Sequence, residues 1–333
     1  MSRPSVVIVS PALAAANNGN WQTARRWHDF LASTCDVRIL QAWPDAEARG
    51  DTVMLALHAR RSAASIRAWA GERGSEGLAV VLTGTDLYQD IQGDAQAQQS
   101  LKLAGRLVVL QELGVAALPQ PLRAKVAVIY QSTEQLTHAP KSHNGVHAVM
   151  VGHLREVKSP RTVFEAARLL AADGDISIDQ IGDALEPALE QEARATERDC
   201  ANYRWLGPLP HDETREHIRR ADILINSSAM EGGAHVVMEA VCSGTPVLAS
   251  RISGNVGMLG TDYEGYFRHG DACGLAELLR RCREGQGRVR QGPSEPLLER
   301  LGAQCALRAP LFAPAVERVA LLRLIDDLLD HRP

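Results

Sequence analysis

The sequence lacks the charge excess and the long apolar runs that would indicate a nucleic-acid or membrane partner. Its 36 Lys and Arg residues against 40 Asp and Glu residues give a formal net charge of −4, which gives no electrostatic case for nucleic acid or for an anionic membrane. No run approaches the ~18 apolar residues of a membrane-spanning helix. The apolar stretch from Ser5 to Ala16 is interrupted by Pro11, so we expect a first buried strand and a ligand loop rather than a signal peptide.

Paired or clustered cysteines are also missing. The six cysteines are scattered without a CxxC, and Cys242 falls in a predicted buried helix, a pattern that fits a reducing cytosol better than disulfides or a zinc site. No GxGxxG follows a predicted strand, so a dinucleotide fingerprint is absent. The DxD triplet at 173–175 precedes a predicted strand and is interpreted as a turn. We therefore expect a cytoplasmic protein, monomer or homodimer, with no stable membrane insertion, no metal and no cofactor.

A chain of 333 residues is expected to form two domains. We place an acceptor-side domain at 1–138, a polar linker at 137–145, a nucleotide-sugar-binding domain at 145–312 and an amphipathic helix at 314–333. Short apolar runs alternate with helical stretches, which predicts parallel α/β sheets with ligands beyond the carboxyl ends of the strands. The predicted strands are 5–11, 36–41, 52–57, 78–83, 106–110, 125–130, 147–152, 176–181, 203–206, 222–226, 246–250 and 265–268.

The most informative stretch is 221–249, where a predicted strand is followed by a glycine loop, a helix and a second strand. Gly232 and Gly233 lack a Cβ atom, so a ligand can approach their backbone closely. With Ala234 they stand at the start of the predicted helix, whose free N–H groups and dipole suit a phosphate or a sugar hydroxyl. We expect a ligand site at this loop.

Two carboxylates flank the loop. Glu231 precedes the predicted helix and Glu239 lies two turns along it. Ionised carboxylates only accept hydrogen bonds, so two of them at this spacing suit the hydroxyl groups of an extended sugar ligand. A glycine loop with two solvated glutamates is the alternative, and the surrounding strand, loop and helix favour the ligand site.

The segment EGGAHVVMEAVCSGTPVLAS resembles the E-x7-E signature of retaining glycosyltransferases of family four. This resemblance implies the GT-B architecture, in which two Rossmann-like doubly wound domains face each other across a cleft, with the last helix crossing back to the first domain. It implies that Glu231 contacts the donor sugar and Glu239 the nucleotide ribose. The family usually has an aromatic residue after the first Glu-Gly, and this chain has Gly233 instead.

Other family positions follow from the same resemblance. GHLREVK at 152–158 is similar to the family segment whose lysine, here Lys158, neutralises the donor diphosphate. His153 stands at the family's arginine position, and Arg155 is a candidate to replace the lost charge. Gly182 lies in the turn that passes near the nucleotide base. His58, at the end of a predicted strand, corresponds to a histidine that reaches the donor sugar. We assign His58, Lys158 and Glu231 as catalytic.

The loops of the first domain contain candidates for both substrates. Gly19 permits a tight turn. Asn20 either caps the next helix or, with Thr23, faces the donor phosphates or the acceptor. Arg60 and Arg61, just after His58, are either a solvated pair or the cations of a small anionic acceptor. Two further residues, Thr83 and Asp86, follow the next strand, where Asp86 either orients a donor group or caps a helix.

The first half carries a narrower resemblance. NNGNWQTARRW, LALHARRSAASI, VLTGTDLYQDI and VIYQS are similar to segments of the bacterial selenosugar synthases of selenoneine biosynthesis. That subfamily is implied to join the sugar of UDP-N-acetylglucosamine or UDP-glucose to selenophosphate, with release of UDP and phosphate. Such a nucleophile needs cationic neighbours rather than a general base. The alternatives are a conventional family-four transferase with a hydroxyl acceptor on a glycan or lipid, a UDP-sugar 2-epimerase, and a non-catalytic UDP-sugar sensor.

Overall fold

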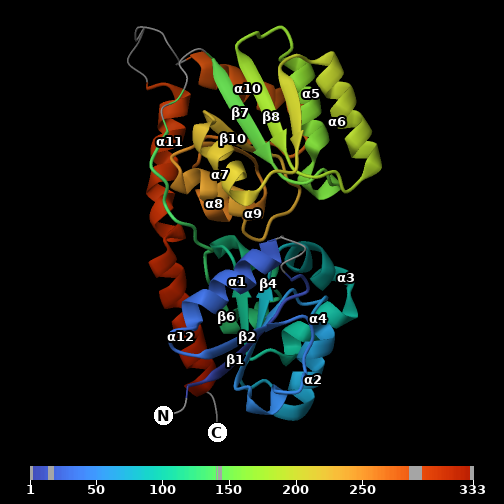
Figure 1. The fold of residues 1–333 in the computed structure, drawn as a ribbon, viewed down its shortest axis with the longest axis vertical. Helices are drawn as coiled ribbons and strands as arrows, with labels where there is room; N and C mark the ends of the chain where they lie inside the picture. Colours follow the sequence, from blue (N-terminus) through green and yellow to red (C-terminus); the bar gives the residue numbers. More distant parts are fainter. Residues whose placement is uncertain (1–2, 14–18, 140, 142–144, 285–294, 331–333) are drawn as a thin grey trace. The chain divides into compact units, whose positions relative to one another are not determined.

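The computed structural model describes residues 3–13, 19–139, 141, 145–284 and 295–330. The chain divides into two compact units (Figure 1). The first unit contains Met1–Ser132, Glu231–Gly233 and Ala313–Pro333, and the second contains Thr133–Met230 and Ala234–Phe312. The chain thus passes from the first unit to the second at 132–133 and back at 312–313, and between these points only residues 231–233 group with the first unit.

A six-stranded parallel sheet forms the centre of the first unit. Its strand order is β2-β1-β3-β4-β5-β6, and Val7 of β1 lies in register with Arg38 of β2 and Met54 of β3. Because β1 leads to β2 on one side and β3 pairs on the other, the topological switch point lies between β1 and β3. The strands are β1 (Ser5–Val9), β2 (Asp36–Leu40), β3 (Val53–Leu57), β4 (Leu78–Leu82), β5 (Arg106–Val109) and β6 (Val126–Val128).

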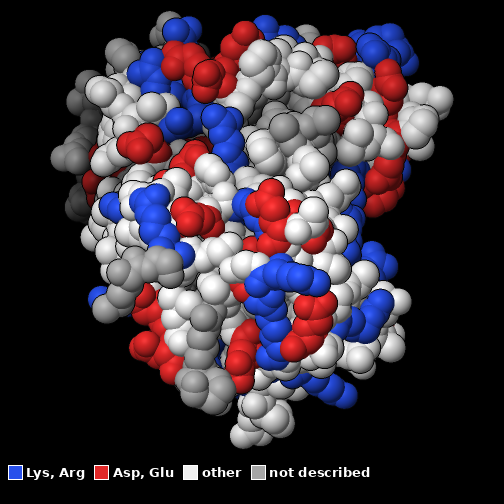
Figure 2. All heavy atoms as spheres, turned by 60° about the horizontal axis from the view of Figure 1, so that its bottom comes forward, with Lys and Arg blue, Asp and Glu red and all other residues white. Residues whose placement is uncertain are grey.

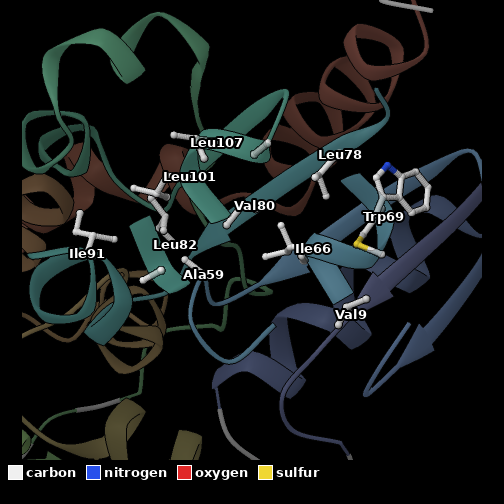
Figure 3. Close-up of a cluster of buried hydrophobic side chains, with 14 of the residues drawn as sticks. Val9, Ala59, Ile66, Trp69, Leu78, Val80, Leu82, Ile91, Leu101 and Leu107 are labelled. Carbon is white, nitrogen blue, oxygen red and sulfur yellow. The ribbon is translucent and has the colours of Figure 1, made fainter. Parts of the chain in front are cut away.

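Helices cover both faces of this sheet. Successive strand residues point to opposite faces, and apolar residues on both faces need to be buried. On one face Ile66 and Trp69 of α2 and Leu101 of α4 pack with Val80 and Leu107 (Figure 3). On the other face α1 and α12 pack against the alternate strand residues, including Val6, Ile8 and Leu55. The helical elements are α1 (Gly19–Leu31), η2 (Ala48–Gly50), α2 (Ala63–Arg73), η3 (Asp86–Asp90), α3 (Ile91–Gly93), α4 (Ala95–Leu103), η4 (Glu112–Ala117), η5 (Gln120–Lys125) and α12 (Pro314–Asp330).

A second six-stranded parallel sheet forms the centre of the second unit, in the order β12-β11-β10-β7-β8-β9. Its topological switch point lies between β7 and β10, so a ligand is expected beyond the carboxyl ends of these two strands. The strands are β7 (Val146–Val151), β8 (Ile176–Ile181), β9 (Tyr203–Gly207), β10 (Ile223–Asn226), β11 (Val247–Ser250) and β12 (Tyr266–Phe267).

The helices of the second unit pack in groups. Helix α10 packs on α5 and on β7 and β8, and α6 packs on α5; α7 packs on α8, and α8 packs on β10 and β11. These elements are η6 (Glu156–Lys158), α5 (Pro160–Leu169), α6 (Pro187–Asp199), α7 (His211–Arg220), α8 (His235–Cys242), α9 (Ser253–Leu259), α10 (Ala272–Glu284), α11 (Leu297–Arg308) and η7 (Ala309–Phe312).

Each predicted strand is present within a residue or two of its expected ends, and the predicted α/β class is confirmed. The stretch from Ser5 begins with β1, while residues 14–16 of it lie outside the described residues. Residues 140 and 142–144 of the expected linker also lie outside them, and the second unit already begins at Thr133. The triplet at 173–175 is a turn whose two aspartates bind Arg283.

The tail helix α12 differs from its expected pattern. The apolar residues Val316 and Val319, expected on its buried side, are each 47% exposed, while Glu317 is fully buried. The carboxylate of Glu317 accepts hydrogen bonds from Arg26 and Trp27 of α1 and from the backbone and hydroxyl of Ser132. A buried carboxylate is tolerated when it is paired and hydrogen-bonded in this way.

The surface and the cysteines agree with the composition. In the view of Figure 2, basic and acidic side chains are interspersed over the described surface. All six cysteines are free, and Cys273 is exposed while the other cysteines are buried. Among the described residues, the helices include none that is long and apolar enough to cross a membrane.

Candidate functional site

Lys158 lies at the switch point of the second unit. Its side chain runs along Gly152, where an added Cβ would lie 3.5 Å from the Lys158 Cδ atom. Its carbonyl accepts a hydrogen bond from Ser227 Oγ (2.8 Å), and the neighbouring carbonyl of Val157 accepts one from the backbone N–H of Ala229 (2.8 Å). The segment after β7 is therefore fastened to the loop after β10, which places an ammonium group beside the expected ligand position.

Gly182 lies against the same segment. A Cβ atom at Gly182 would lie 2.2 Å from the carbonyl oxygen of Gly152, and its φ of +145° also favours glycine. The backbone N–H of Asp183 donates to Nδ1 of His153 (3.0 Å). Burial, the largest effect, lowers the pKa of His153, and nearby Lys158 lowers it further. His153 is therefore neutral near pH 7 and does not replace the charge of an arginine, whereas Arg155 is exposed and charged.

Glu239 is buried on α8 and is paired with an imidazole. Its Oε1 atom lies 2.8 Å from Nε2 of His211, the first residue of α7. The start of α8 differs from the prediction. The backbone N–H of Ala234 was expected to be free for a phosphate, but it points to the sulfur of Met258 at 3.1 Å. A thioether is a weak acceptor, so a ligand oxygen would have to displace this contact.

The glycine loop groups with the first unit. A Cβ atom on Gly232 would lie 2.4 Å from the Thr83 carbonyl oxygen, and one on Gly233 would lie 2.9 Å from Leu110 Cβ. Both positions therefore require glycine because the adjacent backbone or side chain leaves no space. Glu231 is 9% exposed. Thr83 is half-buried, and its carbonyl lies against this loop.

His58 follows β3 at the switch point of the first unit and is 2% exposed. Its φ of +72° lies in the left-handed region, an uncommon conformation that functional sites often contain. Nδ1 accepts from the backbone N–H of Arg61 (3.3 Å), so Nε2 carries the proton and donates to Thr85 Oγ1 (3.2 Å). Burial is the largest effect on His58 and lowers its pKa, which keeps the ring neutral at pH 7.

Asp86 is not the helix cap that the sequence suggested. Its carboxylate is fully buried and accepts from the backbone N–H groups of Ala59, Thr83 and Gly84, each at 2.9 Å. The loops after β3 and β4 are therefore held together by one side chain. With its oxygens taken by the backbone, Asp86 positions both loops rather than facing solvent.

Arg60 and Arg61 are exposed beside His58. The Arg60 Nε atom lies 3.0 Å from Oδ2 of Asp90, a carboxylate that is 8% exposed and is not among the residues predicted from the sequence. Asp90 lies one turn after Asp86 in η3. That spacing is the feature of the sequence that could have indicated a second carboxylate on the same side of the helix. An arginine held at Nε keeps its terminal nitrogens for a second anion.

The start of α1 also differs from the sequence prediction. The helix begins at Gly19, so Asn20 lies in its first turn instead of capping it. Thr23 is 1% exposed. Its hydroxyl donates to the Gly19 carbonyl and accepts from Gln131 Nε2. Thr23 therefore fastens α1 to the segment after β6, and only Gly19 and Asn20 remain at the helix end where a ligand was expected.

The described residues contain no group of three or more His, Cys, Asp or Glu side chains arranged to hold a metal ion. The cations described above at the two strand-end sites include Lys158, Arg155, Arg60 and Arg61. The expectation of a metal-free reaction stays a prediction.

Comparison with known proteins agrees with this geometry. Residues 132–290 match the family described as glycosyl transferases group 1. The chain is 22% identical over 269 residues to glycosyltransferase 1 domain-containing protein 1 of Xenopus tropicalis, covering 73% of this chain and 78% of the relative. Other curated glycosyltransferases are matched over less of their length, 27% and 38% for two of them.

Solved structures resemble the whole chain. Sucrose-phosphate synthase from Thermosynechococcus elongatus superimposes with a TM-score of 0.76 at 15% identity, over 99% of this chain and all of that one. Anabaena Alr3699/HepE in complex with UDP-glucose superimposes with a TM-score of 0.72 at 13% identity, over 97% of this chain and 99% of that one. The chain therefore has the predicted GT-B fold, and its residues 132–290 are similar to the family of glycosyl transferases group 1.

Proposed function

We propose that the protein is a glycosyltransferase that moves a sugar from UDP-N-acetylglucosamine or UDP-glucose to selenophosphate. The selenium atom bonds to the anomeric carbon as the bond from that carbon to the UDP oxygen breaks. Water then cleaves the selenium–phosphorus bond, which gives a 1-seleno-sugar and phosphate. The group 1 match and the GT-B fold support the transferase, and the first-half resemblance to selenosugar synthases supports the acceptor.

One observation carries the donor assignment. Lys158 is held by the hydrogen bond from Ser227 to its carbonyl and lies beside the Gly182 turn, at the switch point between β7 and β10. Negative charge develops on UDP as it leaves, and fixed cations at that position stabilise the transition state. In this proposal Lys158 and Arg155 hold the diphosphate, Glu239 accepts from the ribose hydroxyls and Glu231 contacts the sugar. Likeness to a structure that contains UDP-glucose supports the choice of UDP-sugar.

The acceptor assignment rests on the exposed Arg60 and Arg61 directly after β3. Selenophosphate is already ionised at neutral pH, so the enzyme need not remove a proton from it. A hydroxyl acceptor would need a base. Both ring nitrogens of His58 are already hydrogen-bonded within the protein. The site therefore favours an anionic nucleophile over an alcohol, with His58 shaping the sugar position.

One incubation tests the function. The protein is mixed with UDP-N-acetylglucosamine or UDP-glucose, with and without selenophosphate, and the products are identified by mass spectrometry. A seleno-sugar formed only when both substrates are present supports the proposal. Conversion of the UDP-sugar without an acceptor would indicate a 2-epimerase. Transfer to a hydroxyl acceptor, with none to selenophosphate, would indicate a conventional family-four transferase. UDP-sugar binding without any turnover would indicate a sensor.

Arginine substitutions then test the roles of the residues. Arg60→Ala and Arg61→Ala should raise the KM for selenophosphate by about tenfold or more, as expected for loss of a charge-assisted contact, with little change in the KM for the UDP-sugar. Arg49→Ala is the matched control, because Arg49 is exposed at the amino end of β3, the opposite end from His58. Equal effects on both KM values would contradict the assignment.

A further inference from the structure

His211 and Glu239 form an ion pair between two helices of the second unit. Helix α7 begins at His211 and packs on α8, which contains Glu239. The Nε2 to Oε1 distance is 2.8 Å. The Glu239 side chain is 7% exposed and the His211 side chain 45% exposed. The buried carboxylate is therefore reached from the solvent side by one imidazole.

The charges around His211 favour its protonated form. The hydrogen bond to Glu239 is the largest effect and raises the pKa of His211; burial lowers that pKa, and the charge of Glu239 raises it. On its own helix, Arg215 lowers the pKa, while Asp212, 3.9 Å from Nδ1, raises it. From α8, Cys242 also faces this region, but burial raises the pKa of its thiol to about 11, so it carries no charge near neutral pH.

The hydrogen bond to His211 occupies one oxygen of the carboxylate. Among the described residues no hydrogen bond is formed to Oε2 of Glu239, while Oε1 is taken by His211. A carboxylate held at one oxygen presents the other in a fixed direction. A charge-assisted bond is also stronger than a neutral one, so protonated His211 holds the carboxylate of Glu239 in one orientation.

We propose that His211 is a positioning residue that holds Glu239 for the ribose hydroxyls of the donor, and that donor binding weakens as His211 loses its proton. This inference rests on the proposed function, in which Glu239 meets the ribose. No direct contact between His211 and the donor is required. The effect of His211 must therefore pass through Glu239, and that dependence can be measured.

The test is calorimetric titration of UDP-glucose into the full-length protein without an acceptor, between about pH 6 and about pH 8.5. UDP-glucose is a suitable probe because its diphosphate does not change charge in this interval. His211→Ala should weaken binding about tenfold or more at the low end of the interval, as expected for loss of a hydrogen bond to a charged group. His211→Gln can still donate but cannot titrate, so the pH dependence of binding should be flat in that variant.

Two controls isolate the role of the pair. His217→Gln makes the same change on the same helix, where His217 is half-buried, and should bind UDP-glucose like the wild type. In a Glu239→Gln background, His211→Ala should have little further effect, because the residue acts through the carboxylate. A purely structural role for His211 would weaken binding equally in both backgrounds.

The outcomes separate the two levels of the argument. If the wild type binds neither UDP-glucose nor UDP-N-acetylglucosamine, the proposed function itself is overturned. If the wild type binds but His211→Ala binds equally well, or loses affinity equally in the wild-type and Glu239→Gln backgrounds, the positioning role is overturned while the function stands. Loss of affinity only where Glu239 is intact, with a flat pH profile in His211→Gln, supports the inference.

Discussion

Replacing Glu317 with alanine should destabilise the first unit far more than a substitution at an exposed position of α12. Five hydrogen bonds from Arg26, Trp27 and Ser132 converge on this carboxylate, which has no exposed surface. The substitution leaves the Arg26 guanidinium, only 18% exposed, without its partner. Removing one member of a buried ion pair costs about 3–5 kcal/mol. The apolar contacts of Leu321, Leu324 and other α12 residues remain, so α12 itself should stay in place.

Urea unfolding followed by tryptophan fluorescence measures this loss. Four of the five tryptophans belong to the first unit, so the signal reports mainly that unit even if the two units unfold separately. With a urea slope of about 2 kcal/mol per molar, a loss of about 4 kcal/mol lowers the midpoint by roughly 2 M. Asp326→Ala, at an exposed position of the same helix, is the control. A Glu317→Ala midpoint no lower than that of the control would refute the argument.

Further predictions concern the second unit. Gly182→Ala should unfold that unit at lower temperature in a thermal melt and weaken UDP-glucose binding, because its Cβ would overlap the Gly152 backbone; Gly174→Ala, which has open space, should do neither. Lys141 donates to the carbonyls of Arg219 and Ala221, and burial lowers its pKa to about 8 from a usual 10.5. Since the unfolded chain binds the extra proton between these values, Lys141 should make the free energy of unfolding rise by ~1–2 kcal/mol from pH 8 to pH 10.5, allowing for partial exposure. Urea titrations at both pH values give the free energy of unfolding of the wild type and of Lys141→Met. The difference between the two proteins should grow by this amount from pH 8 to pH 10.5, and an unchanged difference would contradict the burial argument.

The sequence predicts the framework well because the framework depends on local patterns. Short apolar runs such as 53–57 and 78–82 are buried on both faces, and each is followed by the loop where the candidate residues were sought. The glycine positions were also accessible, since Gly182, Gly232 and Gly233 lie where a Cβ atom has no space. These inferences need only the neighbours in sequence and the geometry of parallel sheets.

The missed features depend on partners far apart in the chain. Glu317 belongs to a helix predicted to be amphipathic, and its burial depends on Arg26, which lies 291 residues away. Asp86 was expected either to orient a donor group or to cap a helix, and its carboxylate accepts from the Ala59 backbone 27 residues earlier. His211 and Glu239 are 28 positions apart, and neither helix shows a pattern that indicates their contact. Side-chain pairs of this kind are decided by tertiary packing, which local periodicity does not encode.

Because the first unit takes its last helix from residues 313 onward, its sheet cannot be fully covered until the residues of α12 have been translated. Until then, the strand face that includes Val6, Ile8 and Leu55 lacks the side chains of α12. The second unit is almost contiguous, so it can complete its core first although it is translated later. We expect this order of assembly to make nascent chains that stop before α12 prone to aggregation.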